Sequence, residues 1–172
     1  MKEAPKESAL DKDSRDMSLQ CVDAIEISLF IEKEGLAFYE KAAKNVLDSR
    51  VKDMFLRLAE EERKHIQTLQ TKAQFLKPAI SGQNKPLRRL DSFVSEHIKG
   101  KIFPTIELKA VNKFKNDAEA LDYGIEAEQR SIETLARLME NEKKLDVKAV
   151  FSHLMVEEKK HLALLEDLKE KF

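Results

Sequence analysis

The chain has 172 residues, a length typical of one domain. Charged residues make up 37% of it, aromatic residues 6%, and Gly and Pro number four each, which favours long amphipathic helices over a turn-rich sheet fold. The 31 basic and 32 acidic residues leave a net charge of −1, so we expect no nucleic-acid partner. Cys21 is the only cysteine, which excludes an internal disulfide framework and a four-cysteine metal site within these residues.

The N-terminal segment, residues 1–18, mixes Lys, Glu and Asp without an apolar stretch. We therefore predict a flexible segment that is neither a signal peptide nor a membrane anchor. The sequence has no run of about 18 apolar residues, so we expect no spanning helix and no membrane partner. Residues 19–172 are predicted to form one domain, and the lone thiol fits a cytoplasmic protein.

Two long helices are predicted first. Ile25 and Leu36 belong to an apolar pattern of helical spacing that runs from residue 19 to about residue 47. We expect Ser49 to cap a second helix. The second helix should end before Pro78, because proline disfavours a helical residue before it.

Residues 78–115 hold three of the four prolines and a weak apolar pattern, within which residues 87–98 can form a short helix. We predict a long crossover that lets the next helix start at the same end of a bundle as its predecessor. Asn116 and Glu119 form a capping-box-like start for the third long helix. A fourth follows, so the predicted fold is all-α, a four-helix bundle of two helical hairpins.

The two hairpins are repeats of each other. When residues 121–165 are placed on residues 25–69 without a gap, 11 of the 45 aligned positions are identical. The identical positions include two histidines and glutamates beside them, which the heptad pattern of a helix alone does not explain. The bundle is therefore expected to have approximate two-fold symmetry.

A Glu-x-x-His pair occurs in each half, as Glu62 with His65 and Glu158 with His161. Residues three apart lie on one face of a helix, one turn apart. In both helices that face is the apolar one. A carboxylate in an apolar stripe is costly unless it is paired or binds a cation. A single pair of this kind is most simply a surface accident, but two in register indicate a metal site.

The other two helices each offer a glutamate. Glu128 lies on the apolar stripe of the third helix, whereas Glu126 lies on its polar side. In the first helix both Glu32 and Glu34 have apolar neighbours at helical spacing. The repeat places Glu128 on Glu32, so we choose Glu32 and keep Glu34 as the alternative.

Four carboxylates and two imidazoles from four helices are the ligand set of a dinuclear carboxylate site in a helical bundle. The predicted metal ligands, which are also the predicted catalytic residues, are Glu32, Glu62, His65, Glu128, Glu158 and His161. Oxygen-rich ligation with one histidine per metal favours two Fe ions, with Mn possible and Zn able to substitute. The competing interpretation is a bundle that binds no metal and serves as an interaction module.

Four further side chains near this pattern have simpler interpretations. Tyr39 either packs in the core or hydrogen-bonds a ligand carboxylate. Glu61 and Glu157 match in the repeat but lie about 100° from the ligand face, so we expect them in solvent and keep a role beside the ligands as the alternative. We expect His153 on the surface.

The sequence resembles the rubrerythrin family of the ferritin-like superfamily. The matching motifs are Ile31–Gly35, Phe38–Ala43, Ala59–His65, Ala127–Gln129 and Glu157–His161. The resemblance implies a ferritin-like di-iron bundle, an oxidoreductase that reacts with hydrogen peroxide or dioxygen. It also implies a homodimer. Because these residues include no four-cysteine iron domain, electrons would come from a separate donor protein such as a rubredoxin.

Two positions depart from that family's pattern. Ser131 stands where rubrerythrins usually carry an extra carboxylate that is linked to their peroxide chemistry. Leu135 is the third-helix counterpart of Tyr39. The remaining symmetric six-ligand set resembles the ferroxidase centres of other ferritin-like proteins, so the alternative function is iron oxidation for storage or detoxification.

Overall fold

The structure is a computed structural model that describes residues 19–80, 87–103, 114–140 and 142–172. Its helices are α2 (Cys21–Asn45), α3 (Ser49–Ile80), α4 (Leu87–His97), α5 (Asp117–Glu140) and α6 (Leu145–Glu170). The predicted all-α class is confirmed. The segment predicted to be flexible, residues 1–18, lies outside the described residues.

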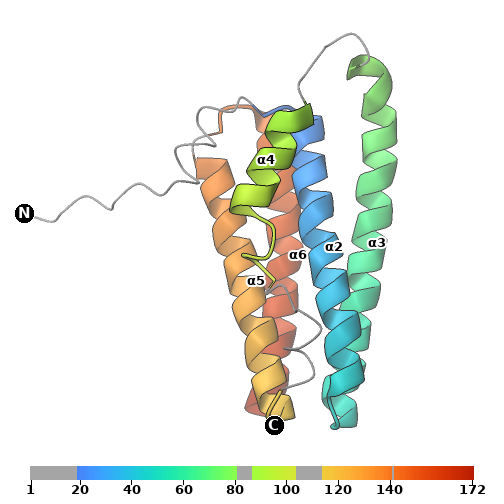
Figure 1. Cartoon of the computed structure of the whole chain (residues 1–172), viewed down its shortest axis with the longest axis vertical. Coiled ribbons are helices and arrows are strands. Elements are labelled where there is room, and N and C mark those ends of the chain that lie inside the picture. Colours follow the sequence, from blue (N-terminus) through green and yellow to red (C-terminus); the bar gives the residue numbers. More distant parts are fainter. Residues whose placement is uncertain (1–18, 81–86, 104–113, 141) are drawn as a thin grey trace, which may run out of the picture.

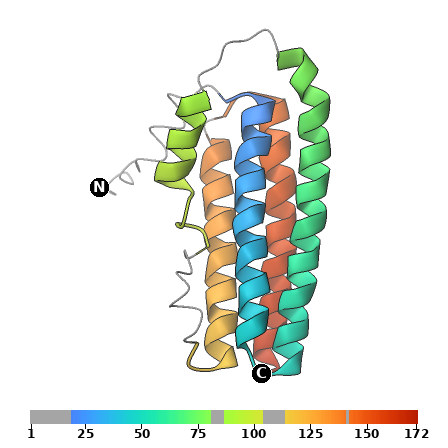
Figure 2. The same cartoon turned by 45° about the vertical axis from the view of Figure 1, so that its right-hand side comes forward.

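The four long helices form one bundle of two antiparallel hairpins (Figure 1). α2 packs along α3, and α5 packs along α6. The views in Figures 1 and 2 agree that α3 ends at the end of the bundle opposite to the one where α5 begins, as the predicted crossover requires. The short helix α4, expected at residues 87–98, lies against α2. Among the described residues no helix is both long and apolar enough to cross a bilayer.

Local capping hydrogen bonds mark the starts of α3 and α5. Asn116 Oδ1 accepts a hydrogen bond from the Glu119 backbone N–H at 2.8 Å, which confirms the predicted start of α5. The cap of α3 is Asp48 instead of Ser49, because the Asp48 carboxylate accepts the Arg50 N–H at 2.8 Å. α3 also continues through Pro78 to Ile80. A proline in the last turn removes only one main-chain donor, which explains why the helix tolerates it.

Polar contacts tie the two hairpins together at both ends of the bundle. At one end the Asp117 carboxylate accepts the backbone N–H groups of Leu47, at 3.0 Å, and Asp48, at 2.5 Å. At the other end Lys144 Nζ donates to the Leu19 carbonyl at 2.6 Å. The first contact joins the turn between α2 and α3 to the first residue of α5. The second joins the turn between α5 and α6 to the residues just before α2.

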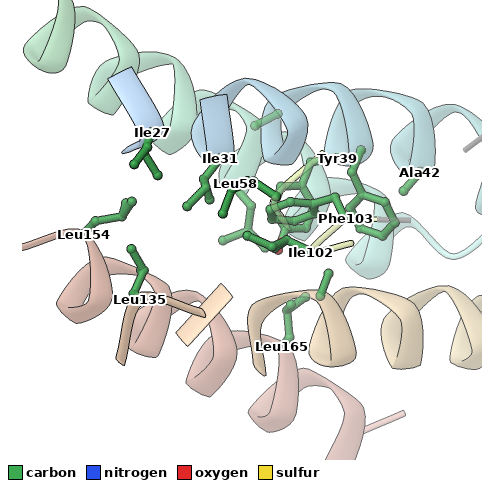
Figure 3. Close-up of a cluster of buried hydrophobic side chains, with 14 of the residues drawn as sticks. Ile27, Ile31, Tyr39, Ala42, Leu58, Ile102, Phe103, Leu135, Leu154 and Leu165 are labelled. Atoms are coloured by element: carbon green, nitrogen blue, oxygen red, sulfur yellow. The ribbon is translucent and has the colours of Figure 1, made fainter. Parts of the chain in front are cut away.

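All four long helices contribute to the apolar core, and side chains of the segment after α4 pack among theirs (Figure 3). Ile102 and Phe103 of that segment are buried, and the Phe103 ring lies 5.9 Å from that of Phe38. Gly35 leaves the space that this packing needs. A Cβ atom there would lie 3.1 Å from Phe103 Cζ and 3.0 Å from a Glu62 carboxylate oxygen.

Candidate metal centre

The structure brings all six predicted ligand side chains together in the middle of the bundle. They come from α2, α3, α5 and α6. The four carboxylates and one imidazole are buried, and the other imidazole is 22% exposed. The full set is Glu32, Glu62, His65, Glu128, Glu158 and His161.

The side chains form two groups, each with ligand atoms within 4.8 Å of one another. In the larger half-site, His161 Nδ1 lies 3.4 Å from Glu62 Oε1 and 3.5 Å from Glu158 Oε2. The same nitrogen lies 3.6 Å from Glu128 Oε1. One carboxylate of α3 thus faces ligands carried by α5 and α6.

In the smaller half-site, His65 Nδ1 lies 3.4 Å from Glu32 Oε1 and 3.6 Å from Glu62 Oε2. Glu62 therefore presents one oxygen to each half-site. The two imidazole rings are stacked, with centroids 5.8 Å apart. Two cations could then be held, one by each half-site, and Glu62 could offer an oxygen to both.

Unpaired polar atoms mark the centre. Most buried polar atoms in proteins have a hydrogen-bond partner, and an unpaired one costs about 1–3 kcal/mol. Within the described part of the chain, all such unpaired side-chain atoms except Ser28 Oγ belong to the six residues. They include both oxygens of Glu32 and the Nδ1 atoms of His65 and His161. A bound cation would use the lone pairs of such oxygen and nitrogen atoms.

Two hydroxyl groups hold carboxylates of the larger half-site. The Tyr39 phenol, fully buried, donates to Glu128 Oε1. Ser131 Oγ donates to Glu158 Oε1 at 2.6 Å. In each case the other oxygen, Oε2, has no partner. Tyr39 thus fills the core and bonds a carboxylate, so both interpretations of it hold.

Glu61 and Glu157 keep part of their side chains in solvent, 30% and 21% exposed, and each also lies beside a candidate ligand, as the alternative interpretation had it. Glu61 Oε2 of α3 lies 3.3 Å from His161 Nε2 of α6. Glu157 Oε2 of α6 lies 3.9 Å from His65 Nε2 of α3. Each carboxylate reaches the outer nitrogen of the imidazole on the opposite hairpin. Glu61 and Glu157 occupy matching positions of the repeat, and this match was the one sequence signal for a role at the site. Helical spacing alone does not predict which side chains of α3 face those of α6.

Crowding of the carboxylates shifts their protonation. Burial, together with the neighbouring Glu62 carboxylate, raises the pKa of Glu32 far above its usual range. Burial opposes ionisation of Glu62 too, but contacts with Glu32, His161 and His65 lower the pKa of Glu62 to about 2. Burial and the nearby Glu158 carboxylate raise the pKa of Glu128. In the metal-free protein, bound protons therefore neutralise part of the negative charge of these carboxylates.

The larger half-site also changes the protonation of its imidazole. Burial opposes charge on His161, but the carboxylates of Glu128, Glu158 and Glu62 outweigh it and raise the pKa of His161. The Tyr39 phenol has a raised pKa because it is buried beside Glu128, so it stays protonated and remains a donor.

Glu34, the alternative to Glu32, lies outside the two groups. Its carboxylate accepts the Gly100 backbone N–H at 3.1 Å and so anchors the turn after α4. Gly100 has φ 68°, a left-handed conformation that favours glycine. His153, expected on the surface, is exposed.

An all-α bundle of two hairpins that buries two Glu-x-x-His pairs and two further glutamates belongs to the class of ferritin-like di-iron carboxylate proteins. The comparisons agree at the level of the family. The rubrerythrin family profile matches residues 23–169, so the chain belongs to the rubrerythrin family. No curated protein and no solved structure gives a significant match.

The donor set fits the di-metal site that is typical of this family. Each half-site offers one imidazole nitrogen and carboxylate oxygens, a mixture that suits Fe or Mn better than a soft metal. The pKa values of Glu32 and Glu128 are raised, and buried atoms of the cluster lack hydrogen-bond partners. Both observations indicate a cluster of carboxyl groups that a cation would stabilise.

Proposed function

We propose that the protein is a di-iron oxidoreductase that reduces hydrogen peroxide, or dioxygen, with electrons from an external donor. The main observation in its support is the pair of half-sites that share Glu62. Several buried oxygen and nitrogen atoms of these half-sites have no hydrogen-bond partner. Four carboxylates balance two divalent cations and leave a higher oxidation state accessible. For peroxide the balance is H₂O₂ + 2 e⁻ + 2 H⁺ → 2 H₂O.

In this proposal the six residues hold two iron ions, which supply the two-electron redox chemistry when bound. The remaining steps belong to the chain. Tyr39 and Ser131 each donate to one oxygen, of Glu128 and of Glu158 respectively, and so fix the orientation of these carboxylates beside His161. Glu61 orients the imidazole of His161. The buried aromatic rings around Tyr39 exclude water from this side of the centre.

The proposal includes a homodimer and a separate electron-donor protein, such as a rubredoxin. The family suggests the dimer, and the single cysteine suggests the donor, because these residues cannot bind a four-cysteine iron centre. Sedimentation of the metal-loaded protein tests the first, and anaerobic reduction by purified rubredoxin tests the second.

Metal analysis followed by anaerobic mixing tests the function. Protein purified without chelators should carry about two Fe or Mn per chain, and Glu62→Ala combined with His161→Ala should abolish binding. The reduced protein is then mixed separately with peroxide and dioxygen, and its absorbance is followed. Full metal content in the double variant would refute the site, and no reaction with either oxidant would refute the reaction.

One observation favours iron oxidation as the second candidate. Ser131 offers a neutral hydroxyl where rubrerythrins usually provide another carboxylate. This hydroxyl donates a hydrogen bond to Glu158 and adds no carboxylate to the ligand set. In that case Fe²⁺ is the substrate. Retention of many iron ions per chain in a large cage would support storage, whereas a dimer that keeps about two would support redox turnover.

A further inference from the structure

A cavity of about 450 Å³ opens between α3 and α6 and reaches the smaller half-site. Its inner lining includes the buried Glu32 together with His65 and Glu157, which are partly exposed. Its outer lining includes the exposed side chains of Lys72 and His153. The cavity therefore connects solvent with two of the candidate metal ligands.

The cavity is far larger than the small oxidants need. A water molecule occupies about 30 Å³ in the liquid, and peroxide and dioxygen have only two heavy atoms each. Pockets of about 300–1,000 Å³ are the usual size for organic ligands. The walls match such a ligand, because Leu69, Val150 and Leu154 present mainly apolar surface between the inner and outer ends.

Charge sets the direction in which a ligand would lie. The carboxylates of Glu32 and Glu157 at the inner end disfavour an anionic group. The Lys72 ammonium at the outer end favours one. Lys72 follows His65 by seven residues of α3, a rise of about 10 Å. An elongated ligand with an anionic head would therefore place its head at Lys72 and its apolar body toward His65.

We propose that this cavity binds an alkyl hydroperoxide with an anionic head group, which the centre reduces to the alcohol. The step is ROOH + 2 e⁻ + 2 H⁺ → ROH + H₂O. The O–O bond breaks, the oxygen attached to carbon stays with the alcohol, and the other oxygen leaves as water. This inference rests on the proposed function, whose external donor supplies both electrons.

Binding to the metal-free full-length protein tests the cavity without any turnover. Butanoate, hexanoate and octanoate are titrated by calorimetry, and each added methylene should tighten binding by up to about fourfold, as expected for burial of a CH₂ group. Octylamine should bind at least tenfold more weakly than octanoate. A flat chain-length series, or equal binding of octylamine, would overturn the inference.

Two variants locate the site. Ala149→Trp should fill the cavity and weaken octanoate at least tenfold, whereas Ala163→Trp, at a position of the same helix that does not line the cavity, should not. Lys72→Glu should weaken octanoate similarly, and Lys52→Glu on the same helix should not. Circular dichroism verifies folding. Equal octanoate binding in either variant and its control would overturn the site.

Turnover separates this inference from the proposed function. In the reduced, metal-loaded protein, the ratio of 8-hydroperoxyoctanoate to hydrogen peroxide turnover should fall at least tenfold in the Ala149→Trp variant. If octanoate fails to bind while hydrogen peroxide still reacts, only the cavity inference is overturned. If octanoate binds but no peroxide reacts, the proposed reaction fails, and with it the reduction step.

Discussion

Glu62→Ala should remove most of the stabilisation that metal ions give to this protein. Glu62 is 1% exposed and gives one oxygen to each half-site, 3.4 Å from His161 Nδ1 and 3.6 Å from His65 Nδ1. No other ligand residue belongs to both groups. One substitution therefore weakens two binding events.

The magnitude follows from mass action. At a free metal concentration one hundred times the Kd, one bound ion stabilises the folded state by about 2.7 kcal/mol. Two ions give about 5 kcal/mol, and in a protein of this size 1 kcal/mol shifts the Tm by roughly 2–4 °C. The wild-type Tm should thus rise by about 10–20 °C with metal, and that of Glu62→Ala by only a few degrees.

Thermal unfolding with and without Fe²⁺ or Mn²⁺, under anaerobic conditions, measures both shifts. Glu60→Ala is the matched control, because Glu60 is an exposed neighbour on α3 that pairs with Arg63. It should keep the whole metal-dependent rise. If Glu62→Ala also kept the whole rise, with two ions per chain, the assignment of Glu62 as the shared ligand would be refuted.

Three further predictions concern the groups around the ligands. Tyr39→Phe leaves a Glu128 oxygen unpaired and should lower the free energy of unfolding of the metal-free protein by about 1–3 kcal/mol in urea titrations; an unchanged value would contradict the role of the phenol. Glu61→Ala should weaken metal binding about 10–100-fold in competition with a chelator, and Glu61→Gln, which still offers an acceptor to His161, should weaken it less; equal losses would argue for a charge effect alone. Because the pKa values of Glu32 and Glu128 are raised, both hold protons that a cation must displace. Metal affinity should therefore rise with pH and binding should release protons, detectable with an indicator dye in weak buffer; a pH-independent affinity would contradict this.

The helices and the convergence of the six side chains could be predicted because both follow from periodicity within single helices. A carboxylate such as Glu128 among apolar neighbours is visible in the sequence, and the repeat selects Glu32 over Glu34. The position of Glu34 itself could not be predicted. Its partner is the Gly100 N–H, 66 residues away, in a turn with positive φ that no local pattern specifies.

Contacts between hairpins were equally hidden. The approach of Glu61 to His161, and of Glu157 to His65, depends on the distance and rotation of α3 relative to α6. Spacing places these glutamates off the ligand face of their own helices, which is correct. The imidazole they reach belongs to the opposite helix. The cap of α3 was predicted one residue late because Asp48 and Ser49 are both good capping residues.

The ties at the two ends of the bundle bear on how ions are exchanged. Asp117 and Lys144 connect the two hairpins at the ends of the bundle, away from the candidate metal ligands. The crowded carboxyl groups of the two half-sites lie between these ends. Because these hydrogen bonds do not depend on the candidate ligands, we expect binding of a cation to cost little conformational entropy of the backbone. A cation could then bind through rotations of the ligand side chains, without separation of the two hairpins.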